Sequence, residues 1–386
     1  MPVKGIIRRQ CIPIIYTRGT HYEVGYDIGR TFASLIQNFL EISVNLNRSY
    51  IPAYETIEGK KAYDDTLECV RKNFPQYVEE IQGTADGASV PFYKLFLLHL
   101  DEITPKACGR NGFKESSGCS TVCVNQKDAV ILGHTEDALS QTLNHFYIVS
   151  AHITNDQPQG RWAVKEERFS SLCYAGHLPG YTMNYNHHGL VFSVNTLSAQ
   201  KLLPGKTPRH FIARALLSAE NFEQAQKILK DSGNGTADGC SVNMTFLNNH
   251  GESLFYNIEI APTYDDNQES ELNIKPGNPG ENLIHCNKYL RMHVPEITGF
   301  MLASSVERLR VLESYADPLD VERIAKMLGD QSHPVYKVFQ EVGPEDRFKT
   351  IAVGIFDCIK RTWTLYSDNP ASNEPLVVMP LVLKDS

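Results

Sequence analysis

The pattern of the sequence changes at one junction, between Gly118 and Cys119, and this change limits the folds open to the chain. Before the junction, apolar residues recur at helical spacing through most of residues 1–110. After it, short apolar runs alternate with polar turns, as they do in antiparallel hairpins. A helical part followed by stacked hairpins and further helices predicts an α+β fold built in layers.

Capping and breaking residues divide the helical part. Thr20 is suited to cap a helix that runs to about residue 45. Pro91 is suited to begin a helix over residues 92–102, because proline is well tolerated at a first helical turn. The other elements expected in this part are a strand at 12–16 and helices at 60–73 and 77–87.

The second part is expected to consist mainly of short strands joined by turns of Gly, Pro, Asn and Asp. Residues 262–282 are polar and predict a surface insertion. The expected strands are 119–124, 129–133, 146–153, 172–175, 181–185, 190–195, 241–247, 253–260, 350–356 and 362–366, and the expected helices are 209–219, 221–231, 305–315 and 319–328.

Composition excludes several classes of protein. The 386 residues carry a net charge of −8, which argues against nonspecific binding of nucleic acid. No run of about 18 apolar residues is present, so no membrane span is expected. The N-terminus lacks the apolar run of a secretory signal, and the nine cysteines are scattered and odd in number. We therefore expect a cytoplasmic protein with reduced thiols.

A cysteine at the start of a strand, directly after a glycine loop, is well placed to act as a nucleophile. Attack of Cys119 on the Gly118 carbonyl, followed by an N-to-S acyl shift and hydrolysis, would cut the chain. Cys119 would then carry a free α-amino group with a pKa of about 7.7–8.0, which can accept the proton of its own thiol. The alternative interpretation is an ordinary cysteine that begins a strand.

The second candidate group lies at residues 133–137, toward the end of the strand that follows Cys119. If the two strands form a hairpin, Asp137 and His134 come close to Cys119. A carboxylate there can hold and orient a protonated α-amine. Glu136 competes with Asp137 for this role, and either acid can instead be a solvated loop residue. His134 can polarise the thiol or satisfy a turn.

Two asparagines at strand ends form the third candidate group. Asn195 and Asn287 each follow an apolar run, where an amide can donate to the oxyanion of a tetrahedral intermediate. Each can equally be a turn residue. His187, His188 and His285 have no ligand partner at helical i, i+4 spacing, so no metal site is predicted.

Four stretches of the sequence resemble one known family. They are Ser-Gly-Cys-Ser-Thr at 117–121, Gly-His-Thr-Glu-Asp at 133–137, the small-residue segment 82–88 and His-Cys-Asn at 285–287. Together they resemble the acyl-coenzyme A:6-aminopenicillanic-acid acyltransferase family, whose members are N-terminal-nucleophile hydrolases that cut themselves before a cysteine. The family's usual His-Thr-Asn-His sequence is altered here at Cys286 and Lys288.

The resemblance implies an αββα sandwich made of two pieces, residues 1–118 and 119–386, that remain together as one structural domain. It implies neither a metal nor an organic cofactor. Bile-salt and penicillin V hydrolases resemble the chain more distantly and carry an arginine where His134 stands, so the role of His134 stays open. Their late catalytic arginine corresponds to Arg308 or to Arg347.

Within the family, residues 20–25, 133–139 and 173–181 are similar to those of members that hydrolyse β-alanyl amines. This similarity implies Cys119-dependent hydrolysis of a small β-alanyl amide, by a heterodimer of the two pieces that can assemble further and has no nucleic-acid or membrane partner. An acyl-coenzyme A-dependent N-acyltransferase and a noncatalytic binding protein for small amides are the alternatives.

Overall fold

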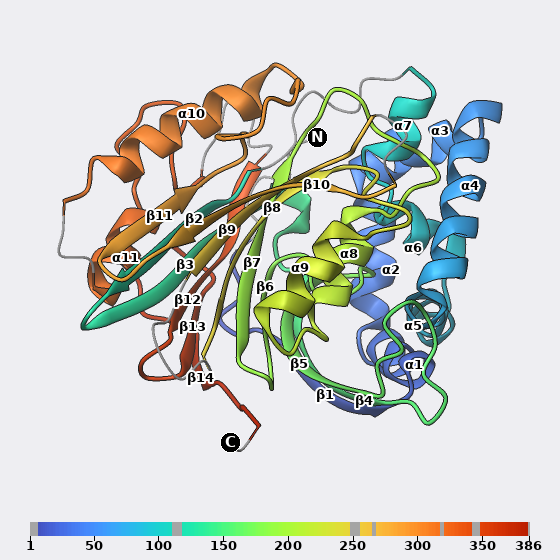
Figure 1. The fold of residues 1–386 in the computed structure, drawn as a ribbon, viewed down its shortest axis with the longest axis horizontal. Coiled ribbons are helices and arrows are strands. Elements are labelled where there is room, and N and C mark those ends of the chain that lie inside the picture. The colour runs from blue at the N-terminus through green and yellow to red at the C-terminus, as the bar shows by residue number, and fades with distance from the viewer. Residues whose placement is uncertain are drawn as a thin grey trace.

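Two β-sheets lie face to face between two layers of helices (Figure 1). The computed structural model describes residues 7–109, 118–247, 255–264, 268–316, 320–341 and 348–384. Helices α10 and α11 cover the outer face of one sheet, and helices α1–α9 cover that of the other.

The larger sheet has eight strands in the order β1-β4-β5-β6-β7-β8-β9-β10. Its only parallel pair among the described strands joins β1 to β4, so the part of the chain before Cys119 supplies an edge strand as well as helices. The strands are β1 (Ile14–Gly19), β4 (Phe146–Thr154), β5 (Glu166–Tyr174), β6 (Met183–Asn186), β7 (Leu190–Leu197), β8 (Gly239–Phe246), β9 (Phe255–Ala261) and β10 (Glu271–Gly277).

The smaller sheet has six strands in the order β11-β2-β3-β12-β13-β14, all antiparallel to their neighbours. The hairpin expected after Cys119 is confirmed, because β2 pairs with β3 and Ser120 lies opposite Thr135. The strands are β2 (Ser120–Gln126), β3 (Ala129–Leu139), β11 (Glu281–His285), β12 (Phe348–Asp357), β13 (Thr362–Tyr366) and β14 (Val377–Pro380).

The helices on the larger sheet come from two stretches of the chain, before Cys119 and after β7. They are α1 (His21–Thr31), α2 (Ala33–Ile42), η1 (Leu46–Tyr50), α3 (Ile51–Tyr54), α4 (Ile57–Asn73), α5 (Pro75–Ala88), α6 (Phe92–Leu98), α7 (Ile103–Ala107), α8 (Arg209–Leu216) and α9 (Phe222–Lys230). On the smaller sheet lie α10 (Phe300–Glu313) and α11 (Val321–Leu328), and the short helix η2 (Ser140–Thr142) follows β3.

Three hydrophobic clusters hold the four layers together. The middle cluster lies between the sheets, where Leu132 and Phe356 of the smaller sheet join Ile148 and Leu172 of the larger one. The other two clusters pack each helical layer against its own sheet. Each side chain buried in this way contributes about 1.5–3 kcal/mol. The layers confirm the predicted α+β fold of the αββα type.

The small residues of segment 82–88 let α5 approach α1 very closely. A Cβ atom on Gly83 would lie 2.1 Å from the carbonyl oxygen of Tyr22, and one on Gly25 would lie 2.1 Å from that of Glu80. Any side chain at these positions would push the helices apart. Thr20 caps α1 as expected, in a capping box with Glu23.

Several expected boundaries are wrong. The helix predicted from Thr20 to residue 45 breaks at Phe32, which leaves helical geometry at φ −108° and ψ 22°. The helix expected over 92–102 ends at Leu98 and resumes as α7. The predicted insertion 262–282 contains β10 and the start of β11, and β14 was not expected. Pro276 is compatible with β10 because β10 is an edge strand.

Two expectations from the sequence concern reduced thiols and the absence of a membrane span. All nine cysteines are free thiols, and most are buried. In the described part of the chain, no helix combines the length and the apolar character needed to cross a bilayer.

Candidate active site

Cys119 lies directly before β2, with its side chain 6% exposed, on the wall of a cavity of about 510 Å³. Its backbone nitrogen donates to Asn287 Oδ1 at 2.8 Å. Its carbonyl oxygen accepts hydrogen bonds from Asn195 Nδ2 at 3.0 Å and from Arg308 Nη1 at 2.8 Å. The structure therefore brings Asn195, on β7, and Asn287, just after β11, together at Cys119.

Arg308 of α10 is completely buried and holds several groups at the Gly118–Cys119 junction. Besides the Cys119 carbonyl, its guanidinium donates to Asn287 Oδ1 and to Ser120 Oγ, both at 2.8 Å. A Cβ atom on Gly118 would lie 2.4 Å from Arg308 Nη2, so a side chain there would displace the guanidinium. Of the two late arginines left open by the sequence, Arg308 lies in the site.

Arg347, the other late arginine, lies outside the described residues, as do Ser116 and Ser117 before the junction.

A chain of amides that the sequence did not reveal orients Asn195. Asn195 Oδ1 accepts from Asn243 Nδ2 at 2.7 Å, and Asn243 Oδ1 accepts from Asn257 Nδ2 at 2.8 Å. Asn257 Oδ1 accepts from Arg291 Nη2 at 2.6 Å. Because a guanidinium can only donate, it fixes the direction of every amide and turns Asn195 Nδ2 toward Cys119. The sequence feature that could have indicated this chain of amides is an asparagine within each of the apolar strands β8 and β9.

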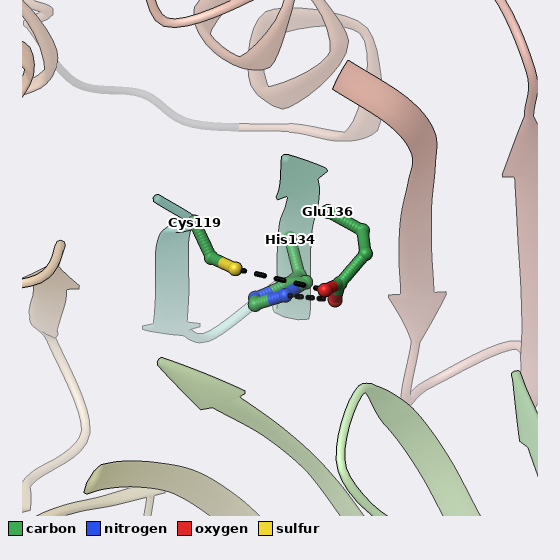
Figure 2. A group of neighbouring side chains, drawn as sticks. All are labelled: Cys119, His134 and Glu136. Atoms are coloured by element: carbon green, nitrogen blue, oxygen red, sulfur yellow. Dashed lines mark hydrogen bonds and ion pairs between the residues drawn. The ribbon is translucent and has the colours of Figure 1, made fainter. Parts of the chain in front are cut away.

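Glu136 contacts the thiol of Cys119 (Figure 2). Its Oε1 lies 3.8 Å from Cys119 Sγ and accepts a hydrogen bond from the Tyr174 hydroxyl. Its Oε2 lies 3.1 Å from His134 Nε2, and His134 Nδ1 lies 2.7 Å from Thr121 Oγ1. His134 is thus hydrogen-bonded to the neighbouring acid, and of these two side chains it is Glu136 that contacts the sulfur.

Asp137 lines the same cavity but has other partners. Its carboxylate accepts hydrogen bonds from Thr350 Oγ1 at 2.6 Å and from Gln340 Nε2 at 3.1 Å. A β-bulge in β12 lies opposite Glu136 and Asp137, and bulges commonly re-aim side chains beside active sites. Contrary to the idea of a solvated loop acid, both carboxylates are buried within β3.

Burial controls the protonation of this site. It raises the pKa of Asp137 to about 7, against the opposing effect of the Arg308 charge. Burial, together with the charges of Glu136 and Asp137, also raises the pKa of the Cys119 thiol well above its usual value. In the uncut chain the thiol is therefore protonated and needs a base before it can attack.

The amide of Asn287 is turned so that its oxygen, not its nitrogen, faces Cys119. Asn287 Nδ2 donates to the Thr196 carbonyl at 3.0 Å, and its second hydrogen can serve a further acceptor. Asn195 presents its nitrogen to the Cys119 carbonyl. The roles of Asp137 as amine partner and of both asparagines as oxyanion donors stay predictions.

The rest of the cavity wall combines carboxylates with rings. Burial lowers the pKa of His177 to about 4 and lowers that of His210 as well, so both imidazoles are neutral near pH 7. The carboxylates of the wall are Asp101, Glu102, Glu136 and Asp137, and its rings are Phe39, Tyr50, Tyr174, His177, Tyr181 and His210.

The group Cys119, His134 and Glu136 offers sulfur, nitrogen and oxygen atoms within 4.8 Å of one another, a set that can bind zinc. Both imidazole nitrogens and the thiol have hydrogen-bond partners here, which explains the arrangement without an ion. His285, considered as a metal ligand from the sequence, is instead hydrogen-bonded to an acid: its Nε2 lies 3.1 Å from Glu259 Oε1.

Asp137→Asn is expected to stabilise the uncut Cys119→Ala chain in a pH-dependent way. Because the pKa of Asp137 is raised, its contribution to stability is complete below about pH 4 and is lost as the pH rises through about 7. The Asn variant should therefore melt about 2–4 °C higher at pH 8 and nearly equally at pH 4. Thermal unfolding measured across this range would contradict the account if the difference did not grow with pH.

Comparisons with known proteins show which family the chain resembles. The family model described as "Acyl-coenzyme A:6-aminopenicillanic acid acyl-transferase" matches residues 124–372. The chain is 53% identical over 380 residues to the beta-alanyl-dopamine/carcinine hydrolase of Drosophila melanogaster, with 98% of each chain covered. It is 22% identical over 368 residues to the 40 kDa form of acyl-coenzyme A:6-aminopenicillanic-acid-acyltransferase of Emericella nidulans, with 94% of each covered.

Among solved structures, a mutant of conjugated bile acid hydrolase from Clostridium perfringens matches with a TM-score of 0.38 and 12% identity, over 69% of this chain and 99% of that one. The match to the family model and the relative aligned over almost the whole length confirm the resemblance seen in the sequence. The protein belongs to the acyl-coenzyme A:6-aminopenicillanic acid acyl-transferase family.

Proposed function

We propose that the protein is a self-processing cysteine amidohydrolase that cleaves small β-alanyl amides. Its substrates are N-β-alanyl-dopamine, which gives dopamine and β-alanine, and carcinine (β-alanyl-histamine), which gives histamine and β-alanine. The observation that carries the proposal is a buried thiol in a cavity whose walls combine carboxylates with aromatic rings. Carboxylates suit the ammonium of β-alanine, and rings suit a catechol or an imidazole. The named activity of the 53% identical relative supports the same substrates.

Maturation begins at the Gly118–Cys119 peptide. The thiol of Cys119 attacks the Gly118 carbonyl carbon, its proton passes to the departing Cys119 nitrogen, the C–N bond breaks, and the acyl group moves to sulfur. Water then hydrolyses this thioester, which leaves a carboxylate on Gly118 and a free thiol and α-amine on Cys119. The carbonyl of Asn287 already accepts from the Cys119 nitrogen, and Asp137 adds negative charge nearby for the resulting ammonium.

Turnover uses the same thiol on an external amide. The α-amine takes the thiol proton, sulfur attacks the β-alanyl carbonyl, and the protonated α-amine gives its proton to the departing amine. Water completes the reaction by hydrolysing the β-alanyl thioester. Asn195 and Asn287 are the candidate donors to the tetrahedral oxyanion. These steps require neither a metal nor an organic cofactor.

The two pieces stay associated after the cut because the sheet crosses between them. Strand β1 belongs to residues 1–118 and pairs with β4 of residues 119–386. The helices of the first piece also share a hydrophobic cluster with the sheet of the second. We therefore propose a heterodimer of the two pieces as the working form.

The function is tested by the release of free amine. N-β-alanyl-dopamine and carcinine should be hydrolysed about 10²-fold faster than N-acetyl-dopamine and N-acetyl-histamine, because an acetyl group leaves a buried acid unpaired. Equal rates on the acetyl amides, or no release by fully cleaved protein, would contradict the proposal. Amine-dependent acyl exchange with acyl-coenzyme A would then favour an acyltransferase, and binding without any turnover would favour a noncatalytic protein.

A further inference from the structure

The four carboxylates of the cavity differ in the cations that face them. Asp101 and Glu102 share the buried guanidinium of Arg209, at 2.7 Å and 3.3 Å. A carboxylate already paired with a fixed cation gains little from a second one. These two acids are therefore poor receptors for a substrate's ammonium group.

Asp137 is also poorly suited to bind a substrate cation. Thr350 and Gln340 each donate to one of its two oxygens, and its side chain is 1% exposed. With a pKa of about 7, it carries only part of its negative charge at neutral pH.

Glu136, unlike Asp101 and Glu102, has no guanidinium partner among the described ion pairs. Among the ion pairs of the described residues, its only partner is the imidazole of His134. The hydroxyl of Tyr174 adds a neutral hydrogen bond, and the Glu136 side chain lines the cavity while only 5% exposed. A buried carboxylate without a permanent cation is costly, and a cation brought by the substrate relieves that cost.

The position of Glu136 also matches the length of a β-alanyl group. Its Oε1 lies 3.8 Å from Cys119 Sγ. A carbonyl carbon poised for attack lies about 3–3.5 Å from the sulfur, and the β-alanyl nitrogen lies at most about 3.8 Å from that carbon. The ammonium of a β-alanyl group can therefore bind Glu136 while the carbonyl carbon of the same group lies within reach of the Cys119 thiol.

We propose that Glu136 binds the ammonium group of the β-alanyl moiety and thereby selects acyl chains that carry a cation two methylenes from the scissile carbonyl. This assignment rests on the proposed function and specifies its acyl subsite. His134 and Tyr174 are then positioning residues that hold the two oxygens of Glu136, which gives His134 a role that does not involve the sulfur.

The test compares two substrates of nearly equal shape, N-β-alanyl-dopamine and N-butyryl-dopamine, which has a methyl group in place of the ammonium. The readout is the ratio of their kcat/KM values. Glu136→Gln should lower this ratio about 10²-fold, because an amide cannot pair with the cation. Glu166→Gln, the same change on an exposed part of β5, should leave the ratio unchanged.

A second variant covers the case in which Glu136→Gln does not fold. Glu136→Asp keeps the charge but draws the carboxylate back by about one C–C bond, 1.5 Å. It should therefore shift preference about tenfold toward the longer γ-aminobutyryl-dopamine.

An unchanged ratio in Glu136→Gln, equal losses on both substrates, or a folded variant that stays uncut would overturn the assignment, as would an unshifted preference in Glu136→Asp. Failure of the wild-type protein to hydrolyse any β-alanyl amide would instead refute the proposed function itself, and with it this subsite.

Discussion

A Cys119→Ala chain is expected to remain one polypeptide of 43.4 kDa and to release no amine from N-β-alanyl-dopamine above background. The sulfur is the only atom of this residue able to form the thioester on which both cutting and turnover depend. The loss should therefore be complete in both assays. Denaturing electrophoresis and an amine-release assay on the same preparation measure the two effects.

Cys123→Ala is the matched control for this variant. Cys123 lies in β2, the strand that directly follows Cys119, but its side chain packs in the cluster between the sheets and does not line the cavity. This chain should be cut and should hydrolyse the substrate normally. Normal cutting of Cys119→Ala would refute the mechanism.

Replacement of Arg308 by methionine is expected to lower the rates of maturation and of amide hydrolysis by about 10²–10³-fold. Methionine fills much of the volume but removes the donors to the Cys119 carbonyl, Asn287 and Ser120. Arg308→Lys keeps the charge but cannot reach all three acceptors with a planar fork, so an intermediate loss is expected. Time courses of cutting and kcat/KM values report the two effects.

Arg310→Met serves as the control because Arg310 lies on the same helix, is exposed, and pairs only with Glu307 among the described ion pairs. It should behave as wild type. If Arg308→Met kept wild-type rates, the arginine would be a structural residue and not a part of the site.

The hairpin at the centre of the site could be predicted because its strands are adjacent in the sequence. A short turn joins two apolar runs, so the residues after Gly133 had to return toward Cys119. The pairing of Ser120 with Thr135 agrees with that expectation. The small residues of segment 82–88 likewise indicated the close contact between α5 and α1.

The more distant parts of the site left no comparable pattern. Arg308 lies 189 residues from Cys119, and within a helix an arginine usually indicates an exposed face. Asn243 and Asn257 matter because β8 and β9 align them beside β7, an order of strands that local spacing does not reveal. Glu136 and Asp137 could be named but not told apart, because their partners Tyr174, Thr350 and Gln340 come from other strands and loops.

The wrong boundaries have a similar cause. The periodicity from Thr20 to residue 45 is continuous, and the break at Phe32 follows from packing, since its ring stacks on Tyr147 of β4. The strand β10 lies at the edge of its sheet and pairs with a neighbouring strand on one side only. Polar residues are tolerated along such an edge, so the sequence of β10 did not indicate a strand. Such features depend on tertiary context, which overrides local preference.

The mass of the purified wild-type protein, measured under denaturing conditions, tests the central claim most directly. Cutting between Gly118 and Cys119 predicts two polypeptides, residues 1–118 and 119–386, of about 13 and about 30 kDa. The larger one should begin with Cys119. A single intact chain of 43.4 kDa that hydrolyses β-alanyl amides at full rate would contradict the account.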